Sequence, residues 1–423
     1  MNKIIIRSII LTLLFCSHLI SGQQSILFMG GIAHLGNGEK INNSIISIKN
    51  GEIDLVADLS KVRIDPEAFD TIYKIYGKHI YPGFIVPNTT LGITEIDAVR
   101  ATHDYDEVGS INPNVRSQIA YNPKSKISET VITNGVLLAQ STPRGGLISG
   151  QSSLMYLHGW NWEDATCKAD DGIHLNWPSS YYKTGWWAEQ GETKKNDQHT
   201  KQINKIKNLL EKSLSYYKSK NTIDLKMESM KGLFNGTKNL YIHANYANDI
   251  IDAIDISKKY QVKKIVIVGG EDAVKVMKKL KENDIPVILN RVHRLPKNED
   301  SQIHEPYQQP AILEKNGILF AFSYEGDMEA MGARNLPFSA GTAVAHGLDY
   351  EKAVSALTLN TAKILGVDNK IGTLEKGKEA TLFISEGDAL DVRSNNVTHI
   401  FIKGKNVDTD NHQRRLYNKY RNR

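Results

Sequence analysis

Five side chains of this sequence could take part in polar chemistry, because each follows or ends a predicted strand. His243 lies in "LYIHA", His293 in "ILNRVHRLP", and Glu325 and Asp327 in "SYEGDMEAMG". Arg144, in "STPRGGLISG", falls on the loop after the second predicted strand. Imidazole and carboxylate groups can move protons at neutral pH or hold a metal ion. We therefore predict three catalytic residues, His243, Glu325 and Asp327, and two that bind a substrate, Arg144 and His293.

Each of these residues also has a purely structural interpretation. His243 lies within an apolar strand and could be a hydrogen-bonded core histidine. His293 stands between two arginines and could belong to a surface loop. The two carboxylates flank a glycine and could only cap the helix that follows. The arginine could be the partner in a structural salt bridge.

Alternating strands and helices must position these residues. Apolar runs predict strands at 83–87, 135–140, 152–157, 240–244, 264–268, 286–289 and 318–323. Amphipathic runs predict helices at 247–260, 271–283, 335–347 and 351–366, the last with Gly366 as its C-cap. Such alternation is typical of parallel strands joined by right-handed crossovers, and its length suits a (β/α)₈ barrel. A fourth strand is not evident, because residues 200–234 read as helical and rich in lysine.

The two ends of the chain have a different pattern. Residues 24–80 and 371–407 contain short strands and turns, including an Asn50-Gly51 turn signal. Neither segment has enough strands to bury one face of a β-sheet by itself. We therefore predict one composite β-sandwich built from 24–80 and 371–407, beside a barrel of residues 83–366, followed by a basic C-terminal tail, 408–423.

Composition and charge exclude some classes of function. The chain has 423 residues, 40% hydrophobic composition and a formal net charge of +5. Basic residues gather at the two ends, so the body between them is close to neutral. Such a body is not typical of a nucleic-acid-binding protein. We interpret the basic C-terminus as a solvated tail.

The N-terminus has the pattern of an export signal. Lys3 and Arg7 precede an apolar run that ends near Ile20, and this run is shorter than the ~20 residues of a membrane-spanning helix. We predict a cleaved signal peptide over residues 1–22 and a periplasmic or secreted protein. Phe15 before Cys16 disfavours a lipoprotein site. Cleavage would leave Cys167 as the single cysteine, which excludes an internal disulfide and is interpreted as structural.

Several motifs resemble those of the amidohydrolase superfamily, most closely its secreted, imidazolonepropionase-like branch. "YPGFIVPNTTLG" resembles the first barrel strand of that family, and "YIHANYANDIIDAI" resembles its fifth strand and helix. "NTAKILGVDNKIGTLEKGKEATLFI" resembles the last helix and the strands that return to the sandwich. The resemblance spans nearly all of residues 24–407. It implies a TIM-like barrel with a metal-dependent hydrolase site at its mouth.

The resemblance also implies where metal ligands should stand. The family uses His-x-His on strand one, Lys or Glu on strand four, histidines on strands five and six, and Asp on strand eight. His243 matches the fifth-strand histidine. The other matched positions hold residues that are poor zinc ligands or no ligands, namely Asn88, Thr90, Gly269 and Ser323. A lone histidine cannot hold a catalytic Zn²⁺, which takes about three protein ligands.

Two hypotheses follow. The first is an exported hydrolase of carbon–nitrogen bonds, in non-peptide or cyclic amides, with an altered or mononuclear site. The second is a non-catalytic barrel that binds a small ligand or an envelope partner. Asn88, Thr90 and Ser323 would then contact the ligand at the vacated positions. One divalent metal such as zinc is compatible with the first hypothesis, a dinuclear centre is not expected, and a homo-oligomer is compatible with both.

Overall fold

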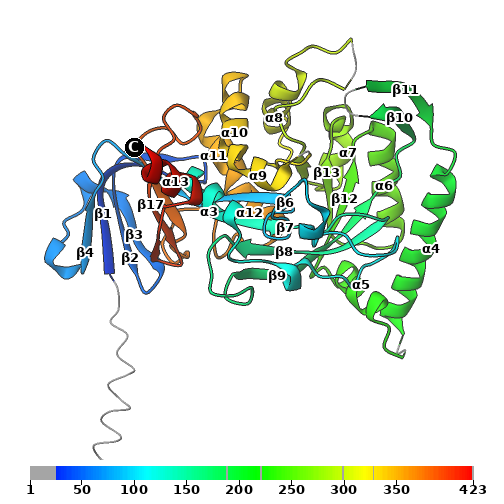
Figure 1. The fold of residues 1–423 in the computed structure, drawn as a ribbon, viewed down its shortest axis with the longest axis horizontal. Helices are drawn as coiled ribbons and strands as arrows, with labels where there is room; N and C mark the ends of the chain where they lie inside the picture. The colour runs from blue at the N-terminus through cyan, green and yellow to red at the C-terminus, as the bar shows by residue number, and fades with distance from the viewer. Residues whose placement is uncertain (1–24, 187–188, 220–221, 298–299, 327, 422–423) are drawn as a thin grey trace, which may run out of the picture.

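The computed structural model describes residues 25–186, 189–219, 222–297, 300–326 and 328–421. The predicted signal peptide and Asp327 therefore lie outside the described residues. Two large sheets dominate the described part of the chain, and most of the helices surround the second of them (Figure 1). No helix of this described part is long and apolar enough to cross a membrane.

Strands from both ends of the chain form the first sheet. Its order is β18-β17-β16-β5-β1-β2-β3, with β4 pairing the other part of β1. The strands are β1 (Ser25–His34), β2 (Lys40–Lys49), β3 (Glu52–Asp58), β4 (Thr71–Lys74), β5 (His79–Pro82), β16 (Leu382–Ser385), β17 (Val397–Ile402) and β18 (Lys405–Val407). The antiparallel pairing of β16 with β5 joins the two segments, and Phe28, Ile80, Leu382 and Phe401 share one buried core. Both chain ends thus build one sheet, while the predicted domain limits stay a prediction.

The second sheet has eight strands and is nearly closed. Its order is β15-β14-β13-β12-β9-β8-β7-β6, and the two edge strands contact each other. The strands are β6 (Phe84–Thr89), β7 (Val136–Ser141), β8 (Ile148–Tyr156), β9 (Thr166–Asn176), β12 (Asn239–Ala244), β13 (Ile265–Gly269), β14 (Val287–Leu289) and β15 (Phe320–Phe322). Their burial on both faces explains the near-continuous apolar runs in the sequence.

Helices cover the outside of this barrel. They are α2 (Ser117–Ala120), α3 (Lys126–Val131), α4 (His199–Lys218), α5 (Leu225–Asn235), α6 (Ala247–Lys259), α7 (Met277–Glu282), α8 (Glu305–Lys315), α9 (Glu329–Gly332), α10 (Leu336–Ala345), α11 (Tyr350–Leu357) and α12 (Leu359–Leu365). Gly366 ends α12 in the left-handed region, at φ 67°, as its predicted role as a C-cap requires. The helix predicted over 351–366 is divided between α11 and α12 at Thr358, whose φ and ψ are −129° and −90°.

The barrel departs from strict (β/α)₈ alternation at β8. This strand runs antiparallel to both β7 and β9, and short loops rather than helices join the three. The inference that all strands are parallel is therefore wrong here. The missing fourth strand is β9, which pairs in parallel with β12. This strand could not be recognised from its sequence, "TCKADDGIHLN", because Asp170, Asp171 and Gly172 interrupt the apolar pattern.

Two surface elements lie outside this framework. An antiparallel hairpin, β10 (Tyr181–Trp186) with β11 (Glu189–Lys195), projects beside α4 and α6 (Figure 1). The basic C-terminus, interpreted as a solvated tail, instead forms α13 (His412–Tyr420). The Asn411 side chain caps this helix by accepting a hydrogen bond from the Arg414 amide, and Arg415 pairs with Glu129 of α3 at 2.7 Å.

Candidate functional site

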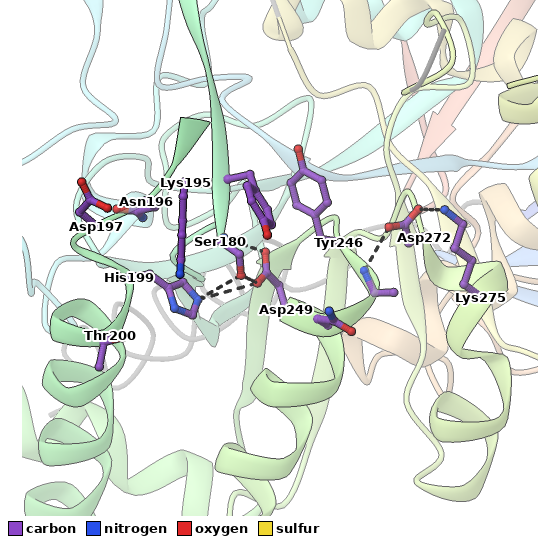
Figure 2. A pocket seen from close by; sticks show the side chains of 13 residues that line it. Ser180, Lys195, Asn196, Asp197, His199, Thr200, Tyr246, Asp249, Asp272 and Lys275 are labelled. Atoms are coloured by element: carbon purple, nitrogen blue, oxygen red, sulfur yellow. Dashed lines mark hydrogen bonds and ion pairs between the residues drawn. The ribbon is translucent and has the colours of Figure 1, made fainter. Parts of the chain in front are cut away.

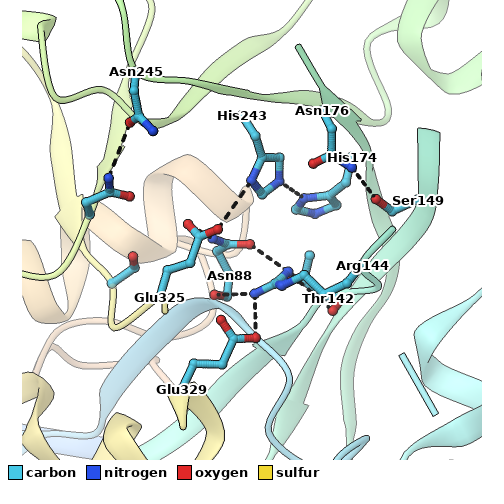
Figure 3. Close-up of polar contacts among 12 residues, drawn as sticks. Asn88, Thr142, Arg144, Ser149, His174, Asn176, His243, Asn245, Glu325 and Glu329 are labelled. Atoms are coloured by element: carbon cyan, nitrogen blue, oxygen red, sulfur yellow. Dashed lines mark hydrogen bonds and ion pairs between the residues drawn. The ribbon is translucent and has the colours of Figure 1, made fainter. Parts of the chain in front are cut away.

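Polar side chains meet where the barrel strands end. Asn88 is the penultimate residue of β6, His174 and His243 lie near the ends of β9 and β12, and Glu325 follows β15. Figure 3 shows these side chains pointing toward one another at the mouth of the barrel. The carboxyl ends of barrel strands are where functional groups gather in this kind of fold.

Arg144 is the cation of this cluster. One guanidinium nitrogen donates to Asn88 Oδ1 at 3.0 Å, and the other donates to the Asn88 carbonyl at 3.1 Å and to Glu329 Oε1 at 2.9 Å. Asn88 has a φ of 51°, a left-handed conformation that asparagine tolerates better than most residues. Burial alone would lower the pKa of Arg144, but the charges of Glu329 and Glu325 raise it, so the guanidinium remains charged.

Glu325 is the central carboxylate. Its Oε2 accepts a hydrogen bond from Asn88 Nδ2 at 2.8 Å, and its Oε1 lies 3.8 Å from His243 Nδ1. Burial alone would raise the pKa of Glu325. The neighbouring His243 ring, the charge of Arg144 and the hydrogen bond from Asn88 outweigh burial and lower this pKa to about 2. Glu325 is therefore ionised at neutral pH, although its side chain is only 30% exposed to solvent.

A chain of hydrogen bonds runs from His243 into the core. His243 Nε2 lies 2.9 Å from His174 Nδ1, and His174 Nε2 lies 2.9 Å from Ser152 Oγ. Ser152 Oγ donates to Asp171 at 2.7 Å, and this carboxylate also accepts hydrogen bonds from Tyr241 and Gln140. Burial, followed by the charges of His243 and Arg144, holds the pKa of His174 well below its ordinary value, whereas burial raises the pKa of Asp171. His174 is therefore neutral and fixes the ring orientation of His243.

A cavity of about 380 Å³ opens beside this cluster. Its polar lining includes His243, Asn245, Asn290, Arg291, Arg294 and Glu325. Arg294 has Glu271 at 3.8 Å as a partner. Within the described part of the chain, Arg291 has no carboxylate or hydrogen-bond partner and only lies over the Tyr324 ring at 5.8 Å. Among the described residues, the guanidinium of Arg291 therefore faces this cavity without a carboxylate partner.

A second cavity, of about 550 Å³, lies under the β10–β11 hairpin (Figure 2). It brings together Ser180, His199 and Asp249, three residue types of a hydrolase triad. The order of contacts is wrong for that chemistry, because Ser180 Oγ donates to Asp249 directly at 2.6 Å and is 3.4 Å from His199. In a triad the histidine accepts the serine proton. The contact instead ties the hairpin to α6.

Only some of the predicted site residues lie together at the mouth of the barrel. It brings together Asn88, Arg144, His243 and Glu325. His293 lies apart, because its Nε2 bonds Thr342 of α10 and its side chain lines another surface pocket.

The remaining predicted residues contribute less to the mouth. Ser323 is buried and donates its hydroxyl proton to the Leu289 carbonyl. Thr90 is buried just after β6, and its carbonyl accepts from the Ile93 amide. Gly269 ends β13 beside Asn245.

Sequence reasoning missed His174, Glu329, Asn245 and Arg291. His174 was missed together with its strand, although "GIHLN" before Trp177 is a short apolar run. Glu329 lies in "MEAMGA", the stretch that follows the two predicted carboxylates, and α9 begins with it. Asn245 follows His243 by two positions, so the strand-end argument that selected His243 could have found it.

The family resemblance implies a metal at this mouth, and the residues present do not fit one. Arg144 engages Asn88 Oδ1, and Glu325 is held by Asn88 and His243. The two imidazoles face each other rather than a common point. No group of three or more His, Cys, Asp or Glu among the described residues is arranged to hold an ion. A dication here would also lie beside a buried guanidinium of the same sign.

Comparisons with known proteins agree with the fold and with the sequence resemblance. Residues 219–407 match the profile of the amidohydrolase family. The resemblance to the amidohydrolase superfamily is confirmed. An amidohydrolase from Thermotoga maritima MSB8 is similar in structure, with a TM-score of 0.77 and 24% identity over 90% of this chain and 99% of that one.

More distant structures share the fold of this amidohydrolase-like chain. A Xaa-Pro dipeptidase with bound methionine in its active site has a TM-score of 0.55 and 13% identity, over 91% of this chain and 100% of that one. An ochratoxinase from A. niger has a TM-score of 0.51 and 14% identity, over 91% of this chain and 94% of that one. At these identities the likeness concerns the fold alone. A search of curated proteins found no match.

Proposed function

We propose that this amidohydrolase-like chain binds a small polar molecule at the mouth of its barrel and does not use metal chemistry there. The observation that carries the proposal is the closed ion network of Arg144, Asn88, Glu325 and Glu329 where the family resemblance implies a metal. The adjoining cavity, about 380 Å³, lies within the usual range for small-ligand sites.

The lining of the cavity supports an anionic amide as the ligand. Arg291 offers a guanidinium that no carboxylate of the described chain neutralises. Asn290 Nδ2 donates to Asn245 Oδ1 at 3.3 Å and to Glu271 at 3.1 Å. This leaves Asn245 Nδ2 as a donor and Asn290 Oδ1 as an acceptor. Such a pair matches the carbonyl and the N–H of an amide, and Arg291 matches a carboxylate.

Calorimetric titration tests this proposal. The probes are N-acetyl-L-alanine, its methylamide, which lacks the carboxylate, and propionate, which lacks the amide. We expect saturable binding of the first alone, weakened about 10-fold or more by Arg291→Ala, because a charge-assisted contact is lost. The matched control is Arg393→Ala, whose guanidinium is 87% exposed and paired with Asp391. Equal affinity for all three probes, or no effect of Arg291→Ala, would contradict the proposed ligand chemistry.

Hydrolysis of a carbon–nitrogen bond without a metal is the second candidate, and the pair of His243 and Glu325 favours it. His243 lines the cavity, and both of its ring nitrogens are oriented by neighbours, Glu325 on one side and His174 on the other. A histidine held in this way can take a proton from a water molecule during attack on an amide. Glu325 would stabilise the resulting imidazolium.

The two candidates differ in turnover. Incubating the chain with N-acetyl-L-alanine and measuring free alanine by mass spectrometry separates them. The binding proposal predicts no product above the level seen with His243→Ala. Product formation that His243→Ala abolishes would instead support the hydrolase.

Export is a separate part of the proposal. It rests on the two basic residues and short apolar run of the first 22 residues. We propose cleavage that leaves Gln23 or Gln24 as the mature N-terminus. N-terminal sequencing of the protein recovered from an expressing bacterium tests this, and a chain that retains Met1 in the cytoplasm would contradict it.

A further inference from the structure

We propose that Arg144 is a resident cation that takes the place of the metal in this barrel. The inference goes beyond ligand binding, because it concerns what holds the mouth together in the absence of any ligand. It starts from the misfit between the metal that the resemblance implies and the contacts of the described residues.

The position of Arg144 is the first argument. The residue follows β7 by three positions, and its guanidinium reaches across the mouth to the end of β6 and the start of α9. Figure 3 shows it in the middle of the cluster, between Asn88 and Glu329. A metal ion in such barrels likewise joins ligands from several strand ends.

The acceptors of Arg144 are the second argument. Asn88 presents both its side-chain oxygen and its carbonyl oxygen to the guanidinium, and Glu329 presents a carboxylate oxygen. These are hard oxygen atoms of the kind that bind divalent cations. The planar guanidinium satisfies three of them at once through its fixed fork of N–H groups.

Charge balance is the third argument. Glu325 and Glu329 are both largely enclosed, and Asn88 links the first of them to Arg144. Two enclosed carboxylates without a cation would repel each other and lose their hydration. Arg144 is bonded directly to Glu329, and its charge also acts on Glu325.

Replacing Arg144 tests whether a cation is required. We expect Arg144→Ala to lower the thermal midpoint of the purified chain by about 5 °C or more, because it leaves a buried acid unpaired. Millimolar guanidinium chloride or MnCl₂ should restore at least half of this loss in the variant and should leave the wild type unchanged. Sodium chloride at equal ionic strength is the control.

Two further variants keep the proposal falsifiable. Arg144→Lys retains the charge, so we expect a smaller loss of stability and no response to MnCl₂. Should Arg144→Ala fail to fold, Arg144→Ala combined with Glu329→Gln should fold, because one uncompensated carboxylate is removed. Unchanged stability of Arg144→Ala, failure of both cations to restore it, or failure of the double variant to fold would overturn the proposal. None of these readouts depends on ligand binding, so the proposed function can fail independently.

Discussion

Glu325→Gln should destabilise the folded chain in a way that depends on pH. The pKa of this carboxyl falls from an ordinary value of 4.5 to about 2. A shift of this size corresponds to about 3 kcal/mol of folding free energy at neutral pH. Glutamine keeps the shape and one hydrogen bond with Asn88 but loses the charge that faces His243 and Arg144.

The direction of the pH effect follows from the sign of the shift. Because the folded pKa lies below the unfolded one, the ionised Glu325 contributes its full stabilisation above about pH 4.5 and loses it between there and about pH 2. Wild type and Glu325→Gln should therefore differ by about 3 kcal/mol at pH 7, and the difference should shrink as the pH falls below about 4.5.

Urea unfolding at pH 7, 5 and 4, followed by circular dichroism, measures this difference. The midpoint should shift while the slope stays constant, because the surface exposed on unfolding does not change. The control is Glu282→Gln, whose side chain is 58% exposed and forms only a 3.9 Å pair with Lys278. A change below about 0.5 kcal/mol at pH 7, as expected for such an exposed pair, would refute the assignment of Glu325 to a stabilised ion network.

Three further predictions concern groups that are buried or partly buried. Asp171→Asn should cost about 2–4 kcal/mol in urea unfolding, because the amide would direct a donor at Tyr241, Gln140 or Ser152; a neutral effect would contradict the hydrogen-bond chain. Since the pKa of His174 is held low, the wild type should lose stability as the pH falls through about 6.5, and His174→Asn should reduce this slope; identical slopes would contradict a neutral His174. Burial raises the pKa of the Cys167 thiol, so iodoacetamide at pH 8 should alkylate it at least about 10-fold more slowly in the folded chain than in urea; equal rates would contradict its enclosure.

The strand–helix alternation could be predicted because most barrel strands are buried on both faces and leave uninterrupted apolar runs. The residues "LYIHA" of β12 and "IVIVG" of β13 are of this kind. The strand β9 could not be predicted in this way. Asp171 lies inside it and is tolerated because Tyr241, Ser152 and Gln140 satisfy its oxygens, and these partners come from three other strands. The antiparallel direction of β8 likewise depends on pairing that sequence periodicity does not encode.

The candidate site was predicted in part. The strand-end argument selected His243 and Glu325, the family resemblance selected Asn88, and the loop after β7 selected Arg144. The carboxylate that pairs with Arg144, Glu329, could not be selected, because a glutamate at a helix start most often interacts with its own helix. His293 shows the opposite error, since a residue that follows a strand can turn away from the mouth, as this one does toward Thr342.

The metal content of the purified chain tests the central claim most directly. The protein is incubated with excess Zn²⁺, freed of loosely bound ions on a chelating resin, and analysed by mass spectrometry, with His243→Ala as the comparison. Because Arg144 already engages the oxygen atoms at the mouth, we expect less than about 0.1 zinc per chain in both proteins, whereas a functional zinc site holds about one. One or two zinc ions per wild-type chain that are lost in His243→Ala would contradict the account.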